Sequence, residues 1–319
     1  MYVLGIDAGG TKTVCYLANS QGEIVGQGRR SGANLQAHGE LEVEKVLHAV
    51  IEQAIGERDI LPAAVCLGVA GVDRPDDDHV VRAIMRRLGY RSHLLVVNDA
   101  LVALVAGVGN EPGVVLIAGT GSIAYGVNED GYAARAGGWG YVLGDEGSGY
   151  WIGREALIAV VRETDGRGPR TLLTPLLLDH FGLAHANGLV REIYDKGVHK
   201  QAIAALGPVV ARARDEGDVV AAEILRRASL ELIRASATVI ERLQMRGKTF
   251  PMVLSGSMFR LIPWLAEDVT HRLGEVAPRT TVRRLEVEPA MGAVHLALKE
   301  LRGGVRVPPY VDHASSTPA

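Results

Sequence analysis

The predicted secondary structure of this 319-residue chain repeats itself, and such a repeat leaves few folds open. Apolar runs and turn residues predict the order βββαβα twice, the second time with extra helices inserted. The first copy has strands near 2–7, 13–19, 23–28 and 63–72, helices at 40–57 and 76–88, and a further strand at 94–98. The second has strands near 114–118, 123–127, 132–136, 250–256 and 280–285, with helices at 260–273 and 290–301.

The two copies also share residues at matching positions. At an offset of 109 residues (119 minus 10), six pairs are identical: Gly10 and Gly119, Thr11 and Thr120, Tyr16 and Tyr125, Asn19 and Asn128, Gly22 and Gly131, and Gly28 and Gly137. Two hairpins can share turn glycines for steric reasons alone. A duplication explains the same matches by two like domains that face each other. We therefore predict an α/β protein with two duplicated domains and an active-site cleft between them.

Composition narrows the class of partner. Hydrophobic residues make up 47% of the chain and charged residues 22%, the balance of a soluble globular protein. A formal net charge of -3 gives no reason to expect nucleic acid or a membrane surface as a partner. The N-terminus shows no signal-peptide pattern, and Cys15 and Cys66 lie in apolar runs, as buried free thiols of a cytoplasmic protein would.

Two glycine-rich turns carry the chemistry of anion binding. Asp7 ends the first strand, and Gly9, Gly10, Thr11, Lys12 and Thr13 follow it; the second turn is Gly119, Thr120, Gly121 and Ser122. Glycine lets backbone N–H groups approach a phosphate, and hydroxyls add donors. Asp7 is suited to hold a hydrated Mg²⁺ beside that phosphate. One such turn could be a plain hairpin, but a matched pair favours ATP held between two domains.

Asp99 follows a buried strand and opens a helix. It could simply cap that helix, because Asp and Asn are good N-cap residues. Alternatively, its carboxylate lies at the mouth between the domains. Phosphoryl transfer to an alcohol needs a carboxylate near the hydroxyl, and Asp99 is our candidate for this base.

Residues 137–153 form the densest glycine-rich stretch, GGWGYVLGDEGSGYWIG. Trp139 offers an apolar face to a sugar ring or an acetyl methyl group, and Asp145 can accept hydrogen bonds from sugar hydroxyls. The stretch could also be only a connector that leads into a helix. A third glycine turn, at Gly256 and Ser257, ends a later strand and could be an ordinary strand-to-helix loop.

Taken in order, these motifs resemble the N-acetylglucosamine kinase branch of the BadF/BadG/BcrA/BcrD-type ATPases, within the sugar kinase/Hsp70/actin superfamily. GIDAGGTKT is similar to the first phosphate motif, GTGS to the second and VLSGSM to the adenosine motif. The resemblance covers Gly5 to Leu301 and is most specific in residues 137–153. It implies ribonuclease-H-like (actin-like ATPase) domains, with ATP and Mg²⁺ as cofactors.

The same resemblance implies a function and a domain division. Asp99 would activate the 6-hydroxyl of an amino sugar that is held by Asn34, Gly138, Trp139 and Asp145. The N-terminal domain would be 1–112 joined by helix 289–302, the C-terminal domain 113–288, and 303–319 a loosely held tail. A homodimer through the C-terminal domain is expected.

Other functions stay open on the sequence. The acceptor could be N-acetylglucosamine, N-acetylmuramic acid or glucosamine. An ATPase that activates an acyl-CoA dehydratase or reductase would hold an iron–sulfur cluster with cysteines, and a catalytically silent sugar sensor would be expected to lack Asp99.

Overall fold

The computed structural model describes residues 1–33, 39–72, 75–91, 93–195 and 199–311. Its first sheet contains β1 (Tyr2–Ala8), β2 (Lys12–Asn19), β3 (Ile24–Ser31), β4 (Ala64–Val69) and β5 (Leu94–Asn98), in the order β3-β2-β1-β4-β5. The first three strands are antiparallel, whereas β4 and β5 run parallel to β1. Helices α2 (Glu40–Ile55) and α3 (Pro75–Arg87) pack against one face through an apolar stripe.

The second sheet repeats this topology. It contains β6 (Gly113–Ala118), β7 (Ser122–Val127), β8 (Ala133–Gly137), β9 (Pro251–Ser255) and β10 (Thr281–Arg284), in the order β10-β9-β6-β7-β8. Matched from β1 and β6 outward, the two sheets have the same strand order and directions. The predicted duplicated α/β architecture is therefore confirmed.

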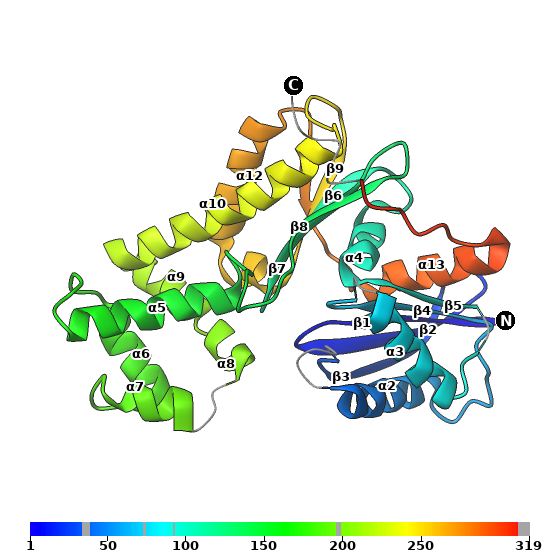
Figure 1. Ribbon diagram of the computed structural model, residues 1–319, viewed down its shortest axis with the longest axis horizontal. Coiled ribbons are helices and arrows are strands. Elements are labelled where there is room, and N and C mark those ends of the chain that lie inside the picture. Colours follow the sequence, from blue (N-terminus) through cyan, green and yellow to red (C-terminus); the bar gives the residue numbers. More distant parts are fainter. Residues whose placement is uncertain (34–38, 73–74, 92, 196–198, 312–319) are drawn as a thin grey trace.

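Two helices lie between the sheets and join them through one apolar core. These are α4 (Asp99–Val108) and α13 (Ala290–Gly303), the latter drawn in orange beside the blue first sheet in Figure 1. Their core also takes side chains from both sheets, such as Val97 and Val253. A Cβ on Gly292 would collide with the carbonyl of Val102, so glycine lets α13 approach α4 closely. The C-terminal helix thus packs on the first sheet.

The helices of the second half pack on the outer face of the second sheet and on one another, and several of them extend away from the sheet (Figure 1). They are α5 (Gly149–Thr164), α6 (Leu173–Phe181), α7 (Gly188–Val190), the π-helical turn η1 (Arg191–Asp195), α8 (Lys200–Ala204), α9 (Gly207–Asp215), α10 (Val219–Arg242), α11 (Ser257–Leu261) and α12 (Pro263–Val276).

The prediction of one continuous helix over 260–273 is wrong. Pro263 ends the hydrogen-bond ladder of α11 and begins α12, where its missing N–H costs nothing. Among the described helices, none is long and apolar enough for a membrane span.

The described part of the C-terminal tail is more ordered than predicted. Ala133 donates from its backbone N–H to the carbonyl of Pro309 and accepts from the N–H of Val311, at 2.8 and 2.9 Å. The ring of Tyr310 meets that of Tyr125 edge-on at 6.2 Å. The tail therefore satisfies backbone groups of the edge strand β8 that would otherwise have no partner in the sheet, which corrects the expectation of a loosely held segment as far as residue 311.

Candidate active site

The parallel strands of each sheet direct their carboxyl ends to one edge, where open α/β sheets bind ligands. In the first sheet, Ala8 pairs with Val69 and Val69 with Asn98, so the segments after β1, β4 and β5 meet there. Asp7 and Asp99, 92 residues apart in sequence (99 minus 7), are thereby brought to the same edge. The parallel pairing of β4 with both β1 and β5 explains this placement.

The two glycine turns face each other across the two sheets. The hydroxyl oxygens of Thr11 and Thr120 lie 2.6 Å apart, in a hydrogen bond between residues separated by 109 positions. Each turn is closed by a short backbone hydrogen bond, from Gly9 N–H to Lys12 and from Gly119 N–H to Gly121. The two glycine turns predicted to bind phosphate therefore meet at their threonine hydroxyls.

The third glycine turn lies directly against the second. Gly256 has a φ of 102°, and a Cβ there would collide with the carbonyl of Ala118 at the end of β6. A residue with a side chain would be strained at this φ and would push β6 and β9 apart. Ser257 begins α11 at the same point. The structure thus gathers the three segments that the sequence assigned to the nucleotide.

Two members of the first motif already have protein partners. The hydroxyl of Thr13 donates to the carbonyl of Ser31 at 2.8 Å, a contact within the β2–β3 hairpin. Lys12 and Arg29 both pair with the carboxylate of Glu288, at 2.5 and 2.7 Å. Glu288 was missed by the sequence reasoning because 276 residues separate it from Lys12 and no local pattern marks it. It ties the first phosphate loop to the segment before α13.

Asp7 lies in a strongly unfavourable setting for a lone carboxylate. Burial, and next the nearby carboxylate of Asp99, raise the pKa of Asp7 to about 8, although Lys12 opposes this. A dication beside these carboxylates would relieve the same repulsion. Mg²⁺ is usually bound by one or two carboxylates together with substrate phosphates and water. The residues present therefore fit the predicted magnesium ion.

The structure decides between the two interpretations of the Asn98–Asp99 pair. The helix cap is Asn98, whose side-chain oxygen accepts a hydrogen bond from the N–H of Ala100 at 2.8 Å. Asp99 is the first residue inside α4 and is half-buried. Capping therefore does not account for Asp99, which favours a chemical role for its carboxylate.

The glycine-rich stretch leads into a helix, as the connector interpretation of it predicts. Ser148 caps α5 by accepting from the N–H of Trp151, so the stretch does lead into a helix. Its Asp145, only 3% exposed, accepts from the backbone N–H of Ser122 at 3.3 Å and thus lies against the second glycine turn.

The other predicted sugar-contacting residues differ in their surroundings. Trp139 is 60% exposed, with the guanidinium of Arg135 4.7 Å from its ring centre. Gly138 has a φ of 73°, which permits the turn before Trp139. Asn34 lies outside the described residues.

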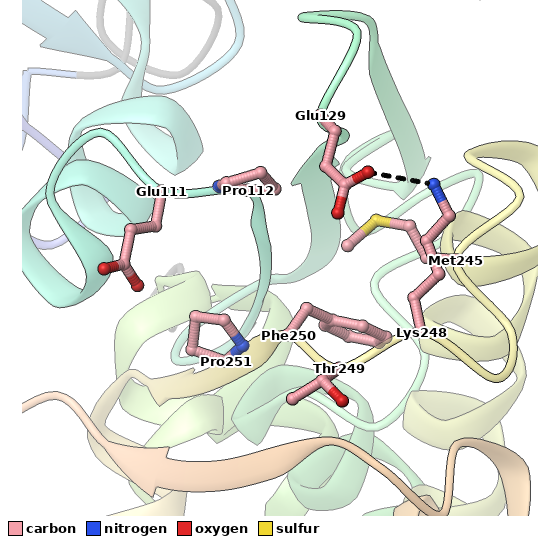
Figure 2. A pocket seen from close by; sticks show the side chains of 8 residues that line it. All are labelled: Glu111, Pro112, Glu129, Met245, Lys248, Thr249, Phe250 and Pro251. Atoms are coloured by element: carbon pink, nitrogen blue, oxygen red, sulfur yellow. Dashed lines mark hydrogen bonds and ion pairs between the residues drawn. The ribbon is translucent and has the colours of Figure 1, made fainter.

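A pocket of about 130 Å³ lies elsewhere, at the amino ends of β6 and β9 (Figure 2). Pro112 and Pro251 border it, and an ion pair of 3.3 Å between Lys248 and Glu129 lies above Phe250. The predicted site residues do not line it. Because ligands of open α/β sheets bind at the opposite, carboxyl end of the strands, we assign the site to the glycine turns.

One known protein family matches most of this chain, including both glycine turns. The BadF/BadG/BcrA/BcrD ATPase family matches residues 4–297. The chain belongs to this family.

Relatives within and around the BadF/BadG/BcrA/BcrD ATPase family include sugar kinases. The chain is 36% identical over 302 residues to the N-acetylmuramic acid/N-acetylglucosamine kinase of Clostridium acetobutylicum, covering 94% of this chain and 99% of that one. It is 32% identical over 309 residues to the N-acetyl-D-glucosamine kinase of Dictyostelium discoideum, covering 92% and 97%. A solved Chromobacterium violaceum protein described as a candidate N-acetylglucosamine kinase is 25% identical, with a TM-score of 0.76 over 93% of this chain and 98% of its own.

The two cysteines bear on the activator hypothesis within this ATPase family. Cys15 lies in β2 and Cys66 in β4, and both are fully buried free thiols. Burial raises the pKa of each thiol far above its usual range. A cluster ligand must be a thiolate that can reach iron. Neither cysteine is placed for that role.

Proposed function

We propose that this protein transfers the γ-phosphoryl group of ATP to the 6-hydroxyl of an amino sugar, with N-acetylglucosamine as the first candidate. The observation that carries the proposal is the contact between Thr11 and Thr120, which joins two phosphate loops at the edge where Asp99 lies. The names of the relatives support the sugar class. N-acetylmuramic acid and glucosamine are the alternative acceptors.

The proposed reaction divides the work among residues of this edge. The turns Gly9 to Thr13 and Gly119 to Ser122 would hold the phosphates, and Gly256 and Ser257 the adenosine side. Mg²⁺, bound by Asp7 through water, would neutralise charge on the phosphates. Asp99 would accept the proton of the sugar 6-hydroxyl while that oxygen bonds to the γ-phosphorus and ADP leaves.

The sugar would lie between the glycine-rich stretch and Asp99. Trp139 would cover one face of the ring, Asp145 would accept hydroxyl hydrogen bonds, and Gly138 and Asn34 would complete the site. The exposure of Trp139 suits a surface that a ligand covers. We further propose the domains 1–112 with helix 289–302 and 113–288, a homodimer through the second domain, and a cytoplasmic location, as the sequence predicts.

An ADP-release assay with a panel of sugars tests the function. We expect turnover to depend on both Mg²⁺ and an amino sugar, with N-acetylglucosamine, N-acetylmuramic acid and glucosamine compared at equal concentrations. Mass spectrometry of the product should show one added phosphoryl group. ATP hydrolysis that proceeds at the same rate without any sugar would contradict the proposal.

Trp139→Ala is expected to weaken sugar binding about fivefold or more, because an aromatic anchor typically contributes over ~1 kcal/mol. ATP affinity should change far less, and Trp139→Phe should retain most of the sugar affinity. Calorimetry with each ligand measures both. Tyr132→Ala, an exposed aromatic in the turn between β7 and β8, is the matched control. Unchanged sugar affinity in Trp139→Ala would leave Trp139 with a structural role.

A further inference from the structure

The short helix α8 is seated on the start of α5 by two glycines. A Cβ on Gly153 would collide with the carbonyl of Ile203, and one on Gly149 would lie 3.0 Å from the carbonyl of Ala204. The two glycines are one helical turn apart and share a face of α5. They belong to the glycine-rich stretch but have no role in the proposed chemistry. Because these two positions carry no side chain, α8 packs closely against α5, the helix that follows the segment with Asp145.

The first residue of α8 points its charge at Asp145. The ammonium of Lys200 lies 2.8 Å from one carboxylate oxygen of Asp145, whose side chain is only 5% exposed. The same ammonium lies 5.2 Å from the ring centre of Tyr141, within the range of a cation–π contact. The next residue, Gln201, donates to the carbonyl of Gly10 at 3.3 Å. The start of α8 therefore contacts both the first phosphate loop and the candidate sugar-binding carboxylate.

Asp145 depends on outside support for its position. Its φ of 62° is uncommon for a residue other than glycine, and its buried charge needs a partner. The N–H of Ser122 and the ammonium of Lys200 use two of the roughly four lone-pair positions of a carboxylate. If Lys200 were removed, the N–H of Ser122, at 3.3 Å, would be the one of these two donors that remains.

We infer that Lys200 is a positioning residue for the sugar: its ammonium holds the carboxylate of Asp145 in the orientation that meets sugar hydroxyls. This inference rests on the proposed amino-sugar kinase function. Lys200 acts through Asp145, so its loss should affect sugar binding and leave the nucleotide loops in place. A cation is the essential property, and arginine should replace lysine in part.

Steady-state kinetics of the full chain with ATP and the preferred amino sugar tests this. Lys200→Met should raise the sugar KM about tenfold or more, the effect seen when a group that orients a binding side chain is removed. The ATP KM should stay within about twofold, and Lys200→Arg should recover much of the loss. Lys248→Met is the matched control. It removes another ion-paired lysine, which lies just before β9 at the amino end of that strand, and the sugar KM should match that of the parent.

A double-mutant cycle separates positioning from a general structural effect. Asp145→Asn should raise the sugar KM by itself, and Lys200→Met combined with Asp145→Asn should be no worse, because the lysine acts through the carboxylate. This double variant also lacks the unpaired charge and serves if Lys200→Met does not fold. Unchanged sugar KM in Lys200→Met, or effects that simply add in the double variant, would overturn the inference. A parent protein that phosphorylates no amino sugar would instead refute the proposed function.

Discussion

Asp99→Asn should lower kcat by about 10²–10⁴-fold, the usual contribution of a general base. The amide keeps nearly the same shape but cannot accept the proton of the sugar hydroxyl. Thermal stability should stay equal or rise slightly, because Asn98 caps α4 and the Asp99 carboxylate raises the pKa of Asp7. Coupled ADP release and thermal melting on one preparation measure both quantities.

The neighbouring cap provides the control for this substitution. Asn98→Ala removes the acceptor for the N–H of Ala100 and should cost about 0.5–2 kcal/mol of stability. The two variants should therefore behave in opposite ways: one stable and inactive, the other destabilised. If Asp99→Asn turned over sugar within about threefold of the parent, well below the range of base catalysis, Asp99 would not be the base.

Asp7→Asn should reduce turnover roughly 10²–10³-fold, the size of effect seen when one electrostatic group is removed from an active site. The same change should stabilise the protein without nucleotide or Mg²⁺, since folding would no longer require a buried carboxylate beside Asp99 to take up a proton. Urea unfolding and ADP release measure the two effects. Activity and stability would then change in opposite directions at one residue.

The raised pKa of Asp7 determines how the free energy of unfolding should change with pH. Asp7 has a pKa of about 8 in the folded protein against 3.8 ordinarily, so between these values the folded state holds a proton that the unfolded chain has lost. Stability of the parent therefore falls as pH rises from about 4 to about 8. The advantage of Asp7→Asn should grow over that window and then level off. An advantage that is equal at both ends would show that Asp7 does not titrate in this way.

Asp218 supplies the contrast for Asp7. It is equally buried, but its carboxylate accepts from Thr171, Leu172 and Ala221 at 2.6–2.9 Å. Asp218→Asn should therefore destabilise the protein by about 1–3 kcal/mol rather than stabilise it, because hydrogen bonds to a charged group are lost.

Local sequence patterns were sufficient for the repeated architecture and for the two glycine turns. Strand and helix periods depend on neighbours a few residues away, and glycine turns depend on φ at single positions. Asp7 was expected at the end of one strand and Asp99 just after another, and the parallel pairing of these strands with β4 brings the two residues to one edge. The same local rules could not choose between Asn98 and Asp99 as the helix cap, since both residue types cap well.

The sequence by itself thus determined two like α/β domains, glycine turns of matching chemistry and carboxylates at the ends of strands. The tertiary structure decided which distant side chains meet: Glu288 with Lys12, Lys200 with Asp145, and the tail with β8. These contacts join segments whose separation along the chain carries no periodic signal. Their partners are fixed by how the two sheets pack around α4 and α13, and that packing is a property of the whole chain.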